Sequence, residues 1–210
     1  MIEYHNKNKI RSFIAIEIPR DLRLKIQTIQ KELQNKKADV KWVLPGGIHL
    51  TLKFLGEITA REVESISNIL NSIIPSWKAF PLRIKGVGCF PSIRNPRIIW
   101  LGIDEGASMV STLQKAIERS AIEQGFSAED RPFRPHLTLG RVRSKRGLEY
   151  LIQAIENLRE VEVGTFKAQE VSLFRSDLKP SGAVYTQLRG FRMFENSEGN
   201  LALGGTHGPR

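Results

Sequence analysis

The tetrapeptide His-Leu-Thr-Leu occurs twice in this chain of 210 residues, at His49–Leu52 and again at His136–Leu139. Two of the four histidines therefore begin copies of one motif. Each copy alternates apolar and polar side chains, a pattern typical of a strand with one buried face. The strand period predicts that the leucines and Phe54 face a core, with histidine and threonine on the opposite face. By the same period, Lys53 shares the face of His49.

Two opposed imidazoles can serve as an acid and a base near neutral pH, because histidine titrates there. A lone His-x-Thr strand is more often structural than catalytic. An internal duplication would explain the shared leucines, but it would not by itself preserve histidine in both copies. The repetition therefore indicates one functional site that contains His49 and His136. The hydroxyls of Thr51 and Thr138 can donate hydrogen bonds to a phosphate oxygen where negative charge develops.

The composition points to a polyanionic partner. Lysine and arginine total 32 against 22 acidic residues, which gives a net charge of +10 and a pI near 9.9. Nucleic acid is the simplest such partner, and a solvated basic surface is the alternative. Cys89 is the single cysteine, so no intrachain disulfide forms and a cytoplasmic location is expected. No signal peptide and no apolar run of membrane-spanning length is visible, so no membrane association is expected.

Hydrophobic periodicity predicts an α+β fold, with two antiparallel sheets and helices packed outside them. Helices are predicted at 21–33, 59–74, 108–124 and 147–158, the second of them starting at a capping box. Besides the motif strands, strands are predicted at 12–18, 40–44, 82–90, 97–103, 166–174 and 183–193. We expect residues 1–194 to form one domain with a motif in each lobe. The polar, glycine-rich segment 195–210 is expected to be disordered.

Further short sequence segments lie around the two motifs. They are Phe13–Ile16, Trp42, His49–Gly56, Gly88–Pro91, Pro96–Gly102, Phe133–Arg141, Ser172–Ser176 and Tyr185. As a set, over roughly residues 11 to 194, they resemble the 2H phosphoesterases. Within this superfamily, these segments most resemble the RNA 2′,3′-cyclic phosphodiesterases, also called 2′-5′ RNA ligases.

This resemblance implies a bilobal fold with pseudo-twofold symmetry and a central cleft between the lobes. It implies hydrolysis of an RNA-terminal 2′,3′-cyclic phosphate to a 2′-phosphomonoester, and in some members 2′-5′ joining of tRNA halves. His49 matches the proton donor of the family and His136 the proton acceptor, whereas the residues alone leave the two roles open. Arg141 matches a substrate-binding family position. We expect a monomer that needs no cofactor.

Several residues keep two interpretations at this stage. Strict alternation turns Arg141 away from His136, so a bulge is needed for it to reach a bound phosphate. Trp42 and Phe133 can stack a terminal base, or pack in the core. Basic residues near the second motif can follow an RNA backbone or form a solvated surface; they are Arg131, Arg134, Arg143, Lys145 and Arg146. No metal is expected, because the two motifs supply only two ligands and no acidic or cysteine ligand stands beside them.

Two other functions compete with a phosphodiesterase. An RNA-binding module could use the same face without chemistry, although the retention of both histidines favours an enzyme. A ligase that joins tRNA halves would use the same site in the reverse direction, so the sequence does not separate it from a hydrolase.

Overall fold

A computed structural model describes residues 9–180 and 182–195. His5 and His207 lie outside these residues. Of the segment 195–210, for which disorder was predicted, all but Glu195 also lies outside them. None of the described helices is both long and apolar enough to cross a membrane.

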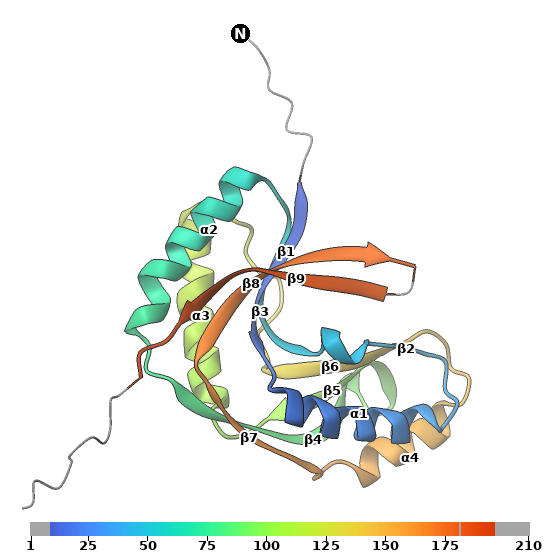
Figure 1. The fold of residues 1–210 in the computed structure, drawn as a ribbon. Coiled ribbons are helices and arrows are strands. Elements are labelled where there is room, and N and C mark those ends of the chain that lie inside the picture. Colours follow the sequence, from blue (N-terminus) through green and yellow to red (C-terminus); the bar gives the residue numbers. More distant parts are fainter. Residues whose placement is uncertain (1–8, 181, 196–210) are drawn as a thin grey trace, which may run out of the picture.

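The described chain forms a mixed α+β structure around one curled antiparallel sheet (Figure 1). The strands lie in the order β7-β4-β5-β6-β3-β1-β8-β9, and β2 pairs with β6. Their bounds are β1 Ile10–Glu17, β2 Val40–Trp42, β3 His49–Ile58, β4 Phe80–Ser92, β5 Asn95–Ile103, β6 His136–Val142, β7 Glu162–Ala168, β8 Glu170–Lys179 and β9 Gly182–Arg192. The helices are α1 Arg20–Gln34, α2 Ala60–Ile73, α3 Ala107–Glu123 and α4 Leu148–Asn157, with 3₁₀ turns η1 Pro45–Gly47 and η2 Ile74–Ser76.

The two motif strands, β3 and β6, meet at the centre of this sheet. Their pairing consists of one antiparallel residue pair, Leu50 with Leu137. The two predicted antiparallel sheets are therefore the two halves of one sheet, joined at the motifs. We call the half with β3, β1, β8 and β9 lobe 1, and the half with β6, β5, β4, β7 and β2 lobe 2. Helices α2 and α3 pack together on lobe 1, and α1 and α4 on lobe 2 (Figure 1).

The chain crosses between the lobes several times. The β4–β5 hairpin follows the first motif in sequence but lies in lobe 2, beside the second motif. The β8–β9 hairpin follows the second motif but lies in lobe 1, beside β1. The second motif strand is therefore held by β5 from the first half of the sequence, whereas β3 pairs with β1 of its own half and β8 adds to lobe 1 beside β1. Neither half of the sequence builds its lobe alone.

The predicted single strand 166–174 is wrong. Strand β7 ends at Ala168 and pairs with β4 of lobe 2, whereas β8 begins at Glu170 and pairs with β1 of lobe 1. The apolar alternation changes phase at this point, because the polar pair Gln169-Glu170 separates Ala168 from Val171. No glycine or proline marks the position where the chain changes lobe, so the break is easily missed. The crossing is imposed by the partners on either side.

The predicted capping box of α2 is confirmed. The Thr59 hydroxyl accepts the Glu62 N–H at 3.2 Å, and the Glu62 carboxylate accepts the Thr59 N–H at 2.7 Å. These bonds satisfy two of the backbone donors that a helix N-terminus leaves open. The helix then buries Ile66 and Leu70. The four leucines of the two motifs are also buried in the main core, which fixes the histidine side of both strands as the opposite face.

Candidate active site

The register of the central strands brings the motif residues together. Extending the Leu50–Leu137 pair by one residue in each direction sets His49 opposite Thr138 and Thr51 opposite His136. These four side chains are partly exposed, while both leucines are fully buried. In a regular antiparallel pair, opposite Cβ atoms are about 4.5–5.5 Å apart and diagonal neighbours roughly 7–8 Å apart. We call this side of β3 and β6 the motif face; the two imidazoles are diagonal neighbours on it.

Both motif strands carry a β-bulge at the same place. In lobe 1, Ile14 of β1 pairs with Lys53 and Ala15 with Thr51, which leaves Leu52 as the extra residue. In lobe 2, Ile99 pairs with Gly140 and Trp100 with Thr138, which leaves Leu139 as the extra residue. An extra residue shifts the alternation by one, so the side chains beyond it change faces. The sixth residue counted from each histidine therefore returns to the motif face.

The bulge in lobe 1 overturns two predictions. Phe54, predicted to lie in the core, is 54 % exposed, and its ring centroid lies 6.3 Å from that of Phe13. Lys53, predicted beside His49, is 1 % exposed on the core side. Its ammonium donates to Glu118 of α3 and to the Ser127 carbonyl, both at 2.8 Å. Strict alternation failed because the register of β1 forces an extra residue into β3.

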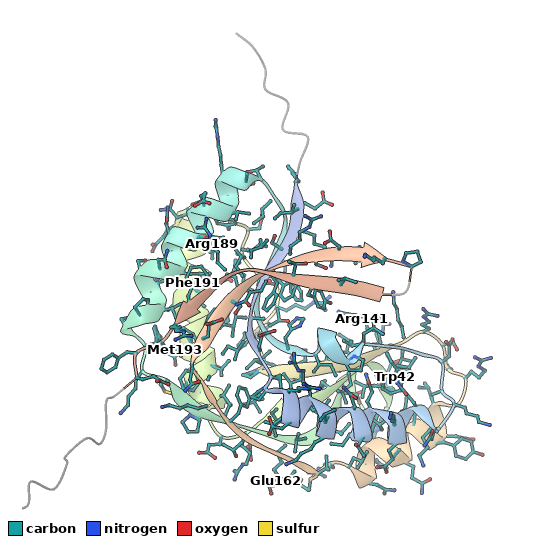
Figure 2. All side chains as sticks on the ribbon, viewed as in Figure 1. Trp42, Arg141, Glu162, Arg189, Phe191 and Met193 are labelled. Atoms are coloured by element: carbon teal, nitrogen blue, oxygen red, sulfur yellow. The ribbon has the colours of Figure 1, made fainter. Side chains whose placement is uncertain are left out.

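The bulge in lobe 2 decides the direction of Arg141. The side chain is exposed. Its positive charge adds to the lowering of the pKa of His136, and it opposes the rise that burial causes in the pKa of Tyr185. In Figure 2, Arg141 lies between β6 and the β8–β9 hairpin. The guanidinium therefore shares the motif face with His136, as the bulge alternative required. Its symmetry counterpart in lobe 1 is Phe54, so the two lobes differ in chemistry at this position.

Aromatic side chains of lobe 1 surround His49. Its ring stacks on Phe13 with centroids 4.5 Å apart, and Tyr185 of β9 meets it edge-on at 5.1 Å. Phe174 of β8 stacks on Phe13 at 5.2 Å and lies 6.2 Å from the His49 ring. Burial among these rings lowers the pKa of His49 to about 4, against a smaller raising effect of a hydrogen bond with the Gly47 backbone.

A backbone carbonyl orients His136. Its Nδ1 lies 2.6 Å from the Arg134 carbonyl oxygen, which can only accept, so Nδ1 carries the proton and Nε2 is left for a ligand. The Phe90 ring meets the imidazole edge-on at 5.1 Å, and Trp100 packs against Phe90 at 5.2 Å. Burial lowers the pKa of His136, and the Arg141 charge adds to this effect.

Burial thus keeps both imidazoles neutral at pH 7 when no ligand is bound. A neutral imidazole is a proton acceptor. The ligand-free motif face therefore has two bases and no protonated imidazole that could act as the acid. An anion bound between the rings would favour the protonated form of either one. Neither Thr51 nor Thr138 makes a side-chain hydrogen bond to another residue in the described part of the chain, which leaves both hydroxyls for such an anion.

Comparison with known proteins identifies the family of this chain. The model of the LigT-like phosphoesterases matches the chain twice, over residues 16–100 and 101–185, so each match contains one motif. The chain belongs to the LigT-like phosphoesterase family. It is 37 % identical, over 88 % of its length and 100 % of the relative, to the RNA 2′,3′-cyclic phosphodiesterase of Methanothermobacter thermautotrophicus. The corresponding protein of Aquifex aeolicus is 33 % identical over 87 % of this chain and 96 % of its own.

Two solved structures have the same fold. A Thermus thermophilus protein superposes with a TM-score of 0.73 at 27 % identity, covering 87 % of this chain and 97 % of its own. E. coli LigT complexed with 3′-AMP superposes with a TM-score of 0.72 at 25 % identity, covering 89 % of this chain and 99 % of its own. The predicted α+β class and the predicted family are therefore confirmed.

The two aromatic residues proposed for base stacking pack in the core of this LigT-like phosphoesterase. Trp42 lies on the core side of β2, where a Cβ at Gly140 would come within 2.9 Å of its ring. In Figure 2 it lies toward α1. Phe133 is partly buried against the same core. The rings that do flank the imidazoles are Phe13, Phe90 and Tyr185. Their sequence signal is weak, because an aromatic residue on a strand reads equally well as core.

Other nucleophiles and metal ligands are scarce near the motif face. Within residues 9–180 and 182–195, no three histidine, cysteine or acidic side chains form a cluster that could hold a metal ion. Cys89 is partly buried, and burial raises the pKa of its thiol, which keeps it in the less nucleophilic protonated form.

Proposed function

We propose that this protein is an enzyme that hydrolyses an RNA-terminal 2′,3′-cyclic phosphodiester to a 2′-phosphomonoester, without a metal or another cofactor. The observation that carries the proposal is the central register, which sets two imidazoles and two free hydroxyls on one face. A diagonal separation of roughly 7–8 Å lets a phosphate sit with one imidazole on each side. Displacement at phosphorus needs this arrangement, since water enters opposite the departing oxygen.

We assign the roles by resemblance to the family. His136 accepts a proton from the attacking water through Nε2, which its bond to Arg134 leaves open. His49 donates a proton to the departing 3′ oxygen of the ribose. Thr51, Thr138 and Arg141 bind the non-bridging phosphate oxygens and stabilise the charge that grows in the transition state.

The names of the relatives support RNA as the substrate class, because the similar M. thermautotrophicus and A. aeolicus proteins are RNA 2′,3′-cyclic phosphodiesterases. The similar E. coli LigT binds 3′-AMP, a nucleotide with a phosphate at one of the two ribose positions concerned. We propose a monomer in the cytoplasm. Joining of tRNA halves through a 2′-5′ linkage would run the same steps in reverse, and product analysis with cleaved tRNA would reveal it.

The direct test is hydrolysis of a dinucleotide 2′,3′-cyclic phosphate in the presence of EDTA. We expect a 2′-phosphate product and no 3′-phosphate, at a rate that EDTA does not change. Binding of the dinucleotide without any product would contradict the enzyme and favour an RNA-binding module. Activity that EDTA abolishes and Mg²⁺ or Zn²⁺ restores would contradict the metal-independent mechanism.

The depressed histidine pKa values predict different pH profiles for kcat/KM and kcat. The acid must be protonated, so the rate falls as pH rises through its pKa. In the free enzyme, which kcat/KM reports, burial holds the pKa of His49 at about 4. A bound phosphate anion raises that pKa, so the alkaline limb of kcat should lie at higher pH than that of kcat/KM. Steady-state kinetics between roughly pH 4 and 9 measure both limbs. If the alkaline limbs of kcat and kcat/KM fall at the same pH, the bound substrate does not raise the pKa of His49.

A further inference from the structure

A set of basic side chains continues the motif face beyond the second motif. Once the bulge at Leu139 has returned Arg141 to this face, alternation places Arg143 on it as well. Strand β2 runs beside this segment, with Lys41 paired to Arg141. Its neighbours Val40 and Trp42 pack on the core, so the exposed Lys41 side chain lies on the same side as Arg141.

The backbone carries the basic surface past the end of β6. The Arg143 N–H donates to the Asp39 carbonyl at 2.9 Å, and the Asp39 N–H to the Arg146 carbonyl at 3.2 Å. These bonds hold the turn after β6 against the segment before β2. Lys145 and Arg146 are exposed on that turn. We call Lys41, Arg141, Arg143, Lys145 and Arg146 the basic track.

Several basic residues elsewhere on the surface have acidic partners. Arg83 pairs with Asp104 at 2.9 Å, Lys85 with Glu160 at 3.3 Å, and Arg175 with Asp177 at 2.8 Å. No member of the basic track forms an ion pair with another residue in the described ranges. Part of the excess positive charge is thus gathered, without local compensation, at one end of the motif face.

The same position in lobe 1 has a different chemistry. The residue equivalent to Arg141 is the exposed Phe54, and Glu57 follows it on β3. Lobe 1 also has a positive charge near the histidines, that of Arg11, which acts on Tyr185, but Arg11 is paired across the strands with the acidic Glu57. The run of adjacent basic side chains therefore lies on lobe 2. Arg143 is seven positions beyond His136, and at about 3.3 Å per residue the chain covers roughly 23 Å. That length suits several nucleotides of a single strand.

We propose that the body of a single-stranded RNA substrate leaves the motif face along the basic track, over β6 and β2 of lobe 2. This proposal rests on the proposed function. A 2′,3′-cyclic phosphate is a 3′ end, so the substrate has nucleotides on the 5′ side of the reacting phosphate alone. One exit path, on one lobe, is then sufficient. No exposed aromatic side chain belongs to the track, so it binds phosphates and does not select a sequence.

The test compares a dinucleotide cyclic phosphate with an RNA of roughly 12 nucleotides carrying the same end, within the range that single-strand grooves cover. The track variant is R143A/K145A/R146A. The control variant is R61A/K115A/R119A, which removes equal charge from exposed positions of α2 and α3 on lobe 1.

For the track variant we expect KM for the longer RNA to rise about tenfold at 0.1 M salt, with dinucleotide hydrolysis unchanged. Three lost contacts should reduce the slope of log affinity against log salt by about 2, at 0.7 per phosphate of a single strand. The control variant should change neither substrate. An unaltered KM for the longer RNA, an equal effect of the control, or an equal loss with the dinucleotide would each overturn the track. Wild-type protein that hydrolyses neither substrate would instead overturn the proposed function.

Discussion

Alanine at either motif histidine should remove most of the activity, by about 10²–10⁴-fold for each proton transfer that is lost. His49→Ala and His136→Ala should have similar effects, and the double variant should be little worse than either single variant. Residues that act in one transition state are non-additive, because the reaction that survives the first loss no longer uses the second residue. Single-turnover hydrolysis of a dinucleotide cyclic phosphate by the four proteins measures this.

The folded state should survive these changes. Both imidazoles lie on the motif face and not in the leucine core, although His49 packs on Phe13 and Tyr185. Thermal melts of each variant, with His49→Gln as a bulkier uncharged control, separate lost chemistry from lost packing. Thr51→Ala and Thr138→Ala should be milder, since the proton transfers remain. A well-folded histidine variant with nearly full activity would show that the paired acid–base mechanism is wrong.

Lys53→Met should produce the largest loss of stability, about 3–5 kcal/mol in the free energy of unfolding. The side chain is 1 % exposed, and Glu118, its partner at 2.8 Å, is 17 % exposed. Removing the ammonium leaves the Glu118 carboxylate in a low-dielectric site without its counter-charge. It also weakens two neighbouring hydrogen bonds. In one, the other Glu118 oxygen accepts the Glu129 N–H, and in the next the Glu129 carboxylate accepts the Phe54 N–H.

Urea unfolding at pH 7 measures the effect of Lys53→Met. The matched control is Lys85→Met, since Lys85 pairs with Glu160 at 3.3 Å on an exposed surface, where an ion pair contributes about 1 kcal/mol or less. Adding Glu118→Gln to Lys53→Met should restore part of the stability, because it removes the stranded charge and keeps an acceptor for Glu129. A Lys53 variant no less stable than the control would mean that water reaches this pair.

Much of the site follows from the chain itself. The repeated motif identified the two strands, and its alternation assigned the leucines to the core and the histidines and threonines to the opposite face. Helix positions and the capping box of α2 followed from local periodicity and side-chain type. These features depend on interactions within a few residues, which is the range over which sequence patterns carry information.

The remaining features depend on partners that are distant in sequence. Whether β3 and β6 carry a bulge is decided by the registers of β1 and β5, and each bulge moves the following side chain to the other face. Phe54 was therefore assigned wrongly, and the direction of Arg141 stayed open. The burial of Lys53 requires Glu118, 65 residues away.

Local sequence patterns also do not predict in which lobe each hairpin lies. Strands β7 and β8 were predicted as one strand because only a phase change at Gln169-Glu170, with no glycine or proline, separates them. Trp42 and Phe133 read as base-stacking candidates for a similar reason, since an aromatic side chain is suited both to a core and to a nucleotide. The sequence thus specified which residues form the two motif strands. The strand partners β1 and β5, which are distant in sequence from the motifs they pair with, decided which side chains accompany the histidines.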